Sequence, residues 1–163
     1  ARNNNIKGLN LLGLGYLKGY GVEQNYGQAV NLFLKAAEQG YARAQFNLGL
    51  CYANGTGVRQ NYKEAVYWYR KSANQGYANA QNNLGNCYKY GNGCEKSLEL
   101  AVNLFLKSSE QGNIKAFCNL AICYEEGTGV EKNFETAIAY YRKAANQGDK
   151  FAEEKLMKLE QNK

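Results

Sequence analysis

The sequence contains neither histidine nor proline. Without histidine, the chain lacks the most common general base and the imidazole ligand of many metal sites. No apolar run approaches the roughly 18–20 residues that a membrane-spanning helix needs. Lysine and arginine number 20 against 14 acidic residues, a net charge of +6 with no long run of one sign. This balance is compatible with acidic partners and is weak evidence for nucleic-acid binding.

Glycine, in contrast, is abundant and periodic. Gly40, Gly76, Gly112 and Gly148 follow one another at intervals of 36 residues. A fixed period of this size is typical of a solenoid, in which each unit buries its apolar face by stacking on its neighbours. We therefore expect one solenoid domain over residues 1–163. Its repeats are residues 5–40, 41–76, 77–112 and 113–148, and residues 149–163 follow them.

The second repeat begins with a helical pattern. Ala44, Leu48 and Tyr52 are four residues apart, which places them on one face of a helix over about 41–54. Gly55 ends this helix, because glycine adopts the left-handed backbone conformation at little cost. The first half of each repeat is therefore predicted to be a helix that stops at a glycine loop.

A second helix follows the loop in each repeat. Asn61 with Glu64 three residues later indicates a capping box, in which each side chain accepts from a backbone N–H of the other residue. This predicts a second helix that ends at about Asn74. The capping positions of the four repeats are Asn25, Asn61, Ser97 and Asn133.

Residue types recur at matching offsets in all four repeats. Small residues at one position and large ones at the next predict stacked packing rather than a binding site. Gly49, beside the apolar face of its helix, would let a second helix approach closely. The recurring positions are Leu12, Leu48, Leu84 and Leu120; Tyr16, Tyr52, Tyr88 and Tyr124; Ala29, Ala65, Ala101 and Ala137; and Phe33, Tyr69, Phe105 and Tyr141.

The two ends of the chain differ. Ala152 and Leu156 continue the pattern, but charged residues surround them, so residues 149–163 are expected to form a polar capping helix. Residues 5–18 contain more leucines than one buried stripe uses. Exposed apolar surface usually marks an interface, so docking or self-association through the helix over residues 5–18 is expected.

The repeated unit reads A-x-x-x-L-G-x-x-Y-x-x-G-x-G-V, followed by a capping residue, A-x-x-(W/L/Y)-(F/Y) and a closing glycine. Over residues 5–148 this pattern resembles the Sel-one-like repeat family, which is similar to tetratricopeptide repeats with a longer loop. The resemblance implies an all-α, right-handed α/α superhelical solenoid whose concave face is lined by the first helices. It also implies a non-enzymatic scaffold or adaptor that binds a protein or peptide. Cys94 and Ala121 depart from the pattern, at the loop valine and the helix glycine.

The five cysteines do not suggest disulfides or a metal site. Cys51, Cys87 and Cys123 share one position, and equivalent helices of adjacent repeats lie roughly 8–10 Å apart or more. That separation exceeds the ~7 Å limit for a disulfide, so buried free thiols are expected. The odd count favours a reducing compartment such as the cytoplasm, although a secreted or luminal location is left open. No Cys-x-x-Cys pair exists, and no metal or cofactor is expected.

The loop glycines also have a simple explanation. They resemble a phosphate-binding loop, but they lack the strand–loop–helix context and the lysine that such a loop requires. Because they recur in every repeat, they are predicted to be architectural.

Partner-binding residues are expected on the first helices, facing away from the second helices. These positions vary among repeats while the packing positions recur, as expected of a face that binds a ligand. Any solvated surface also tolerates variation. The predicted concave-face residues are Lys7, Asn10, Leu14, Arg43, Phe46, Leu50, Asn79, Asn82, Asn86, Tyr90, Lys115, Cys118, Ile122 and Glu126.

A nucleic-acid surface is the alternative hypothesis. Cations recur once per repeat on the second helices and could follow a phosphate backbone. Cations near helix C-termini also compensate the helix dipole, which makes this alternative the weaker of the two. The stripe comprises Lys35, Arg70, Lys71, Lys107, Arg142 and Lys143.

Overall fold

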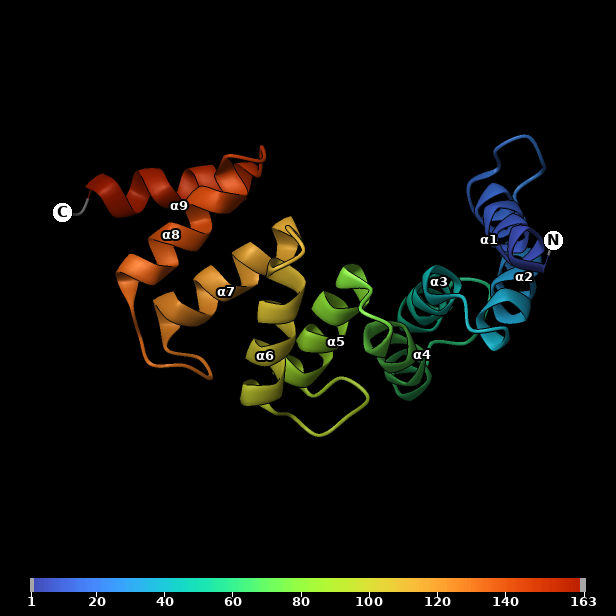
Figure 1. Ribbon diagram of the computed structural model, residues 1–163, viewed down its shortest axis with the longest axis horizontal. Coiled ribbons are helices and arrows are strands. Elements are labelled where there is room, and N and C mark those ends of the chain that lie inside the picture. The colour runs from blue at the N-terminus through green and yellow to red at the C-terminus, as the bar shows by residue number, and fades with distance from the viewer. Residues whose placement is uncertain (1, 162–163) are drawn as a thin grey trace. The chain divides into compact units, whose positions relative to one another are not determined.

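The computed structural model describes residues 2–161, and the side chains of residues 5–159. These residues form nine α-helices and no β-strand, as the all-α prediction requires (Figure 1). The helices are α1 (Arg2–Lys18), α2 (Tyr26–Glu38), α3 (Ala42–Asn54), α4 (Tyr62–Asn74), α5 (Ala78–Tyr90), α6 (Leu98–Ser109), α7 (Ile114–Glu126), α8 (Phe134–Ala145) and α9 (Lys150–Gln161).

The chain gathers into two compact units. The first comprises the chain up to Ala80 together with Asn92–Glu95, and the second comprises Gln81–Gly91 together with the chain from Lys96 onward. In the first unit, α1 packs on α2, α2 on α3, and α3 on α4. In the second unit, α6 packs on α7, α7 on α8, and α8 on α9. Packing between consecutive helices is the arrangement of a repeat solenoid. The single domain over residues 1–163 stays a prediction.

Each second helix begins at its predicted capping residue. Oδ1 of Asn61 accepts hydrogen bonds from the backbone N–H groups of Lys63 and Glu64, at 3.0 and 3.2 Å. The predicted capping box is wrong in one respect, because the N–H of Asn61 donates to the Tyr52 carbonyl at 2.9 Å and does not reach Glu64. The same backbone bond joins Asn25 to Tyr16, Ser97 to Tyr88 and Asn133 to Tyr124. In each repeat, this hydrogen bond joins the start of the second helix to the first helix.

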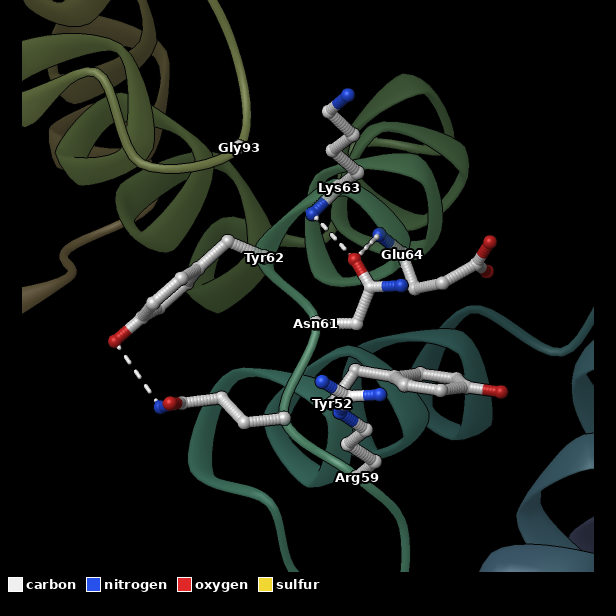
Figure 2. A pocket seen from close by; sticks show the side chains of 8 residues that line it. Tyr52, Arg59, Asn61, Tyr62, Lys63, Glu64 and Gly93 are labelled. Carbon is white, nitrogen blue, oxygen red and sulfur yellow. Dashed lines mark hydrogen bonds between the residues drawn. The ribbon is translucent and has the colours of Figure 1, made fainter.

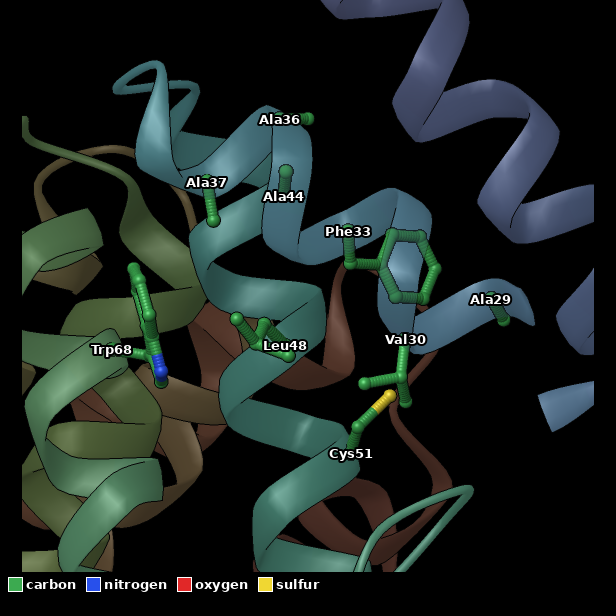
Figure 3. Packing of buried hydrophobic residues seen from close by; sticks show 9 residues of the cluster. All are labelled: Ala29, Val30, Phe33, Ala36, Ala37, Ala44, Leu48, Cys51 and Trp68. Atoms are coloured by element: carbon green, nitrogen blue, oxygen red, sulfur yellow. The ribbon is translucent and has the colours of Figure 1, made fainter. Parts of the chain in front are cut away.

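The core of the first unit is built from small and large side chains of α2, α3 and α4 (Figure 3). Ala29, Phe33, Ala36 and Leu48 have no exposed surface, and Trp68 is 7% exposed. Alanines let the helices approach, and the aromatic and leucine side chains fill the space that remains. The pattern of small and large residues in the sequence therefore corresponds to the packing of this core.

Helical glycines allow this close approach. A Cβ atom at Gly49 would lie 2.6 Å from the ring of Tyr69, and one at Gly85 would lie 2.6 Å from the ring of Phe105. Such contacts are too short for any side chain, so the expected role of Gly49 is confirmed. In the fourth repeat Ala121 occupies this position and is fully buried.

The second glycine of each loop is also architectural. Gly57 has a φ of 72°, and a Cβ there would collide with the backbone carbonyl of Tyr26 in the preceding repeat. Gly93 meets Tyr62 in the same way, and Gly129 meets Leu98. The glycine loop of one repeat therefore packs against the start of the second helix in the repeat before it.

The capping helix predicted over residues 149–163 corresponds to α9. Residues 162–163 of the predicted range lie outside the described part of the chain. Nζ of Lys155 lies 3.1 Å from both carboxylate oxygens of Glu125, and Oη of Tyr141 donates to Glu125 at 2.6 Å. Burial opposes ionisation of Glu125, but the hydrogen bonds from Tyr141 and Lys155 outweigh it and lower its pKa. Ala152 is fully buried, so α9 is joined to the second unit by apolar and by ionic contacts.

One packing prediction needs correction. Leu12 is 45% exposed, whereas the equivalent Leu48 and Leu120 are fully buried. The reason is that α1 packs on α2, while α3 packs on both α2 and α4. The recurring tyrosines of the first helices are half-buried and pack against the edge of the core, as Tyr88 and Tyr124 illustrate.

Candidate partner-binding site

Two hollows lie on the first helices of the repeats, one in each unit. The hollow of the first unit, termed the N-groove, has a volume of about 310 Å³. It combines side chains from α1 and α3 with Tyr41 and Tyr77, which follow the closing glycines of two repeats. The N-groove is lined by Lys7, Asn10, Leu11, Leu14, Tyr41, Arg43, Asn47 and Tyr77.

The N-groove is cationic. Lys7 and Arg43 are exposed, and no carboxylate is among the described residues that line the groove. The sequences of α1, α3 and α5 contain no aspartate or glutamate at all. The acidic residues of the first two repeats lie instead in loops and second helices, such as Glu38 and Glu64. The described residues that line the N-groove therefore present positive charge and no carboxylate.

The hollow of the second unit, termed the C-groove, has a volume of about 240 Å³. It combines residues of α5 and α7 with residues at the start of α9. Asn86 lines the C-groove at the position where Leu14 lines the N-groove. The C-groove is lined by Asn82, Asn86, Lys115, Cys118, Asn119, Asp149 and Phe151.

The two grooves occupy equivalent positions, 72 residues apart in the sequence. Two repeats and the first residues that follow them therefore form one groove, and the chain contains this arrangement twice. The pairs of equivalent lining residues are Asn10 and Asn82, Leu14 and Asn86, Arg43 and Lys115, Asn47 and Asn119, and Tyr77 and Asp149.

An asparagine pair links two first helices in each groove. Asn47 Nδ2 donates to Asn10 Oδ1 at 2.9 Å, and Asn119 Nδ2 donates to Asn82 Oδ1 at 2.8 Å. Asn10 is 3% exposed and Asn82 is 2% exposed. Buried amides that lose their partners are costly, so these bonds fix the spacing of the helices that form each groove.

The electrostatics of the C-groove differ from those of the N-groove. Asp149 stands where the N-groove has Tyr77, so the C-groove contains a carboxylate as well as Lys115. Burial, together with the charge of Asp149 and a hydrogen bond with it, raises the pKa of Cys118 to about 12. The Cys118 thiol therefore stays protonated near neutral pH and is a poor nucleophile.

The predicted concave-face residues fall into two groups. Eight of the fourteen line one of the two grooves, and six do not. The first group is Lys7, Asn10, Leu14 and Arg43 in the N-groove, with Asn82, Asn86, Lys115 and Cys118 in the C-groove. The second group is Phe46, Leu50, Asn79, Tyr90, Ile122 and Glu126.

Several residues of the second group have contacts within their own unit. The ring of Phe46 lies 5.3 Å from that of Tyr77 and 5.9 Å from that of Tyr69, so Phe46 packs between aromatic side chains. Ile122 packs against the apolar cluster beneath α9. Glu126 accepts a hydrogen bond from the Thr128 hydroxyl at 3.2 Å.

The remaining members of that group lie outside the grooves as well. Leu50 is half-buried, and Asn79 Nδ2 donates to the Tyr77 hydroxyl at 3.3 Å. Tyr90 is 63% exposed, and Nζ of Lys89 lies 5.5 Å from the centroid of its ring. Whether any of the six contacts a partner stays a prediction.

The sequence interpretation missed Leu11, Tyr41, Asn47, Tyr77, Asn119, Asp149 and Phe151. One signal could have found some of them. Contacts between neighbouring first helices join residues 37 apart, as in the Asn10–Asn47 bond, rather than residues one period of 36 apart. Leu11, Asn47 and Asn119 each lie one position after a predicted residue and line a groove.

A third hollow, of about 690 Å³, lies at the loop end of α4 (Figure 2). Asn61 already accepts from the backbone N–H groups of Lys63 and Glu64 at the start of this helix. Gly93 packs against Tyr62. The loop geometry thus serves helix capping and packing, which agrees with the architectural interpretation of the glycines.

The cations of the second helices are exposed, but some contact aromatic rings of their own unit. Nζ of Lys71 lies 4.6 Å from the ring centroid of Tyr67 and 5.2 Å from that of Trp68. Nζ of Lys143 lies 5.3 Å from the ring centroid of Tyr140. These cation–π contacts give the lysines a structural role that needs no phosphate backbone.

The cysteines are free thiols, and Cys51, Cys87 and Cys123 are buried as expected. Burial raises the pKa of Cys51 to about 11. Within residues 2–161, no group of three or more histidine, cysteine or acidic side chains is placed to hold a metal ion. In the same part of the chain, no helix has both the length and the apolar character that crossing a membrane requires.

Comparison with protein families settles the ancestry of the repeats. The Sel1 repeat model matches four times, at residues 6–41, 42–77, 78–113 and 115–149. The chain belongs to the Sel1 repeat family. Proteins of this family generally mediate protein–protein interactions and are generally non-catalytic.

Two solved Sel1 repeat structures are similar to the chain over nearly its whole length. One is c5321, a protective antigen of uropathogenic Escherichia coli strains with an SLR fold, which shares 37% identity at a TM-score of 0.89. The other is a Sel1 repeat protein from Oxalobacter formigenes, with 42% identity and a TM-score of 0.84. The matches cover 96% and 94% of this chain, but only 33% and 63% of those proteins. The chain thus spans about a third of the first relative and less than two thirds of the second.

A more distant structure supports the fold alone. Cysteine-rich protein B of Helicobacter pylori shares 21% identity at a TM-score of 0.62, over 79% of this chain and 92% of that protein. No curated protein matches the chain.

Proposed function

We propose that this chain is a non-enzymatic scaffold module that binds a protein or peptide through the first helices of its repeats. The observation that carries the proposal is the N-groove, a hollow whose described lining residues include cations, tyrosines and leucines but no carboxylate. The equivalent C-groove supports it, because the lining residues of the two grooves differ while the packing beneath them is the same. Variable residues on a repeated framework are what selective binding requires.

Nucleic-acid binding along the second helices is the alternative. It has weaker support, because Lys71 and Lys143 already contact aromatic rings. Binding to nucleic acid that weakens steeply with added salt would favour this alternative, and no binding at low salt would exclude it.

We also infer an apolar docking surface on α1. Leu11 is 66% exposed and Leu12 is 45% exposed, although the equivalent Leu48 is fully buried. A second copy of the chain offers the same two leucines, so a symmetric contact between two α1 helices would cover both. Leu11 also lines the N-groove, so this contact and ligand binding in the N-groove would share one side chain.

A photo-crosslinking residue introduced at single exposed positions tests the scaffold proposal. Arg43 and Lys115 report on the first helices, and Lys35 and Lys107 on the second helices. Proteins captured from a lysate by the intact chain should crosslink at Arg43 or Lys115. Crosslinks confined to Lys35 and Lys107 would contradict the proposal. Phe46→Glu is a poor probe of binding, because Phe46 packs against Tyr69 and Tyr77 and its replacement would also disturb the fold.

A further inference from the structure

Asn10 carries a hydrogen-bond donor that the protein itself does not use. Its Oδ1 accepts from Asn47 at 2.9 Å, while its Nδ2 has no acceptor in the described part of the chain. Asn10 is only 3% exposed, yet Nδ2 is not sealed from solvent, because Trp68 Nε1 is the one fully enclosed side-chain polar atom without a partner among the described residues. Because Asn10 lines the N-groove, its Nδ2 donor is available to an acceptor from a ligand, which would take the place of water there.

The equivalent amide of the second unit is satisfied internally. Asn82 Nδ2 donates to Asn83 Oδ1 at 3.3 Å, and Asn82 Oδ1 accepts from Asn119. In the first unit the residue that follows Asn10 is Leu11, whose side chain cannot accept a hydrogen bond. A single difference, Leu11 against Asn83, thus leaves the donor of the N-groove available to an outside group.

The positive charges around this donor favour a negatively charged acceptor. Lys7 and Arg43 line the same groove, and no carboxylate accompanies them among its described lining residues. A carboxylate would gain a charge-assisted hydrogen bond and opposite charges together. In the C-groove, Asp149 is a carboxylate of the protein itself, so the positive charge of this groove does not favour an acidic ligand in the same way.

The shape of the site favours an extended ligand. Leu11, Leu14 and two tyrosines give the N-groove an apolar lining beside its charged groups. A smaller hollow of about 270 Å³, lined by Ile6, Lys7, Gln39, Gly40 and Tyr41, shares Lys7 and Tyr41 with it. A chain that enters one hollow can therefore continue into the other.

We propose that the N-groove binds an internal segment of a partner protein in which an aspartate or glutamate lies beside a large apolar residue. The carboxylate accepts from Asn10 Nδ2 and pairs with Lys7 and Arg43, while the apolar side chain lies against Leu14 and the tyrosines. This specifies the ligand chemistry of the proposed scaffold function and rests on that function.

The test is a selection of peptides by the intact chain. The library displays about twelve random residues, roughly 40 Å when extended, between two folded flanks so that no peptide end is free. Selected peptides should be enriched in an acidic residue beside leucine, isoleucine or phenylalanine. They are then synthesised with acetylated and amidated ends, and their affinity is measured by fluorescence anisotropy. Replacing the acidic residue with its amide should weaken binding at least about tenfold.

Two sets of variants locate the site. Arg43→Glu should weaken binding at least about tenfold, while Lys35→Glu, a charge reversal on α2 in the same unit, should change it less than about twofold. Leu11→Asn places an acceptor beside Asn10, as Asn83 does beside Asn82, and should weaken binding more than Leu11→Ala does. Circular dichroism checks that each variant is folded.

The outcomes separate this inference from the scaffold function. Equal affinity of the acidic peptide and its amide form, or equal effects of Leu11→Asn and Leu11→Ala, would each overturn the inference. A captured protein that still crosslinks at Arg43 in those cases would leave the scaffold function standing. Crosslinks at Lys35 and Lys107 alone would contradict both.

Discussion

The two units share the same packing positions, but they differ in the hydrogen bonds and charges of their grooves. In the first unit, Asn10 Nδ2 has no acceptor among the described residues, and Lys7 and Arg43 line a groove whose described lining includes no carboxylate. In the second unit, the equivalent Asn82 donates to Asn83, and Asp149 adds a carboxylate to the groove. Duplicated packing positions therefore do not imply duplicated binding. The side chains that differ between the units determine in which groove a hydrogen-bond donor is available to a partner.

The terminal helices differ in the same sense. Leu12 on α1 is 45% exposed, because α1 contacts α2 and has no neighbour on its other side among the described helices. On α9, Lys155 pairs with Glu125, which also accepts from Tyr141. The C-terminal helix is thus held by specific polar contacts, and the N-terminal helix leaves apolar surface uncovered.

The largest expected effect separates two equivalent leucines. Leu48→Ala should lower the free energy of unfolding by about 2–5 kcal/mol, because it opens a cavity in a fully buried site. Leu12→Ala should lower it by less than about 1 kcal/mol, because Leu12 is partly in solvent already. Urea denaturation followed by circular dichroism measures both. Equal losses would mean that something covers Leu12 in solution.

A medium effect concerns the contacts that hold α9. Tyr141→Phe removes the hydroxyl that donates to Glu125 at 2.6 Å and should cost about 1–2 kcal/mol of unfolding free energy. Tyr124→Phe, on the neighbouring helix, is the control and should cost less than about 0.5 kcal/mol. In the background of Glu125→Ala, Tyr141→Phe should lose most of its effect, as a double-mutant cycle would show. An undiminished effect there would mean that the hydroxyl stabilises the fold without Glu125.

A smaller effect should appear in acid. The pKa of Glu125 is lowered in the folded protein, so its contribution to stability is fully present above the unfolded pKa, near 4.5, and is lost as the pH falls through the folded value. Glu125 and Lys155 are partly exposed, so we expect no more than about 1 kcal/mol. Denaturation at pH 7 and pH 3 measures it. The difference between wild type and Glu125→Gln should shrink at the lower pH, and a constant difference would rule out this linkage.

Much of the fold could be predicted because it depends on residue type and spacing. The 36-residue glycine period and the recurring alanines and aromatics are set by packing between neighbours, and packing repeats when the sequence does. Ala29, Phe33 and Leu48 accordingly lie in the core as expected. Leu12 shows where the rule ends, because burial also depends on whether a neighbouring helix is present.

The grooves were only partly predictable. Helical geometry predicted Lys7, Arg43 and Lys115 on one face of the first helices, and these residues line the two grooves. It did not reveal that neighbouring helices meet at residues 37 apart, so Asn47 and Asn119 were missed. The unused donor of Asn10 could not be read from the sequence either, because it depends on which atoms of three side chains meet.

The smallest change in stability and the clearest change in association are expected from Leu12→Lys. The lysine ammonium can reach water from a half-exposed position, so the free energy of unfolding should change by no more than about 0.5 kcal/mol. If two α1 helices pair in solution, the wild-type chain should show a molar mass that rises with concentration in sedimentation or light scattering. Leu12→Lys should remain at the monomer mass, because two buried ammonium groups would repel each other and lose hydration. Met157→Lys, at a 60% exposed position on α9, is the matched control and should associate like the wild type. A wild type that stays monomeric at every concentration would show that α1 does not pair with a second copy.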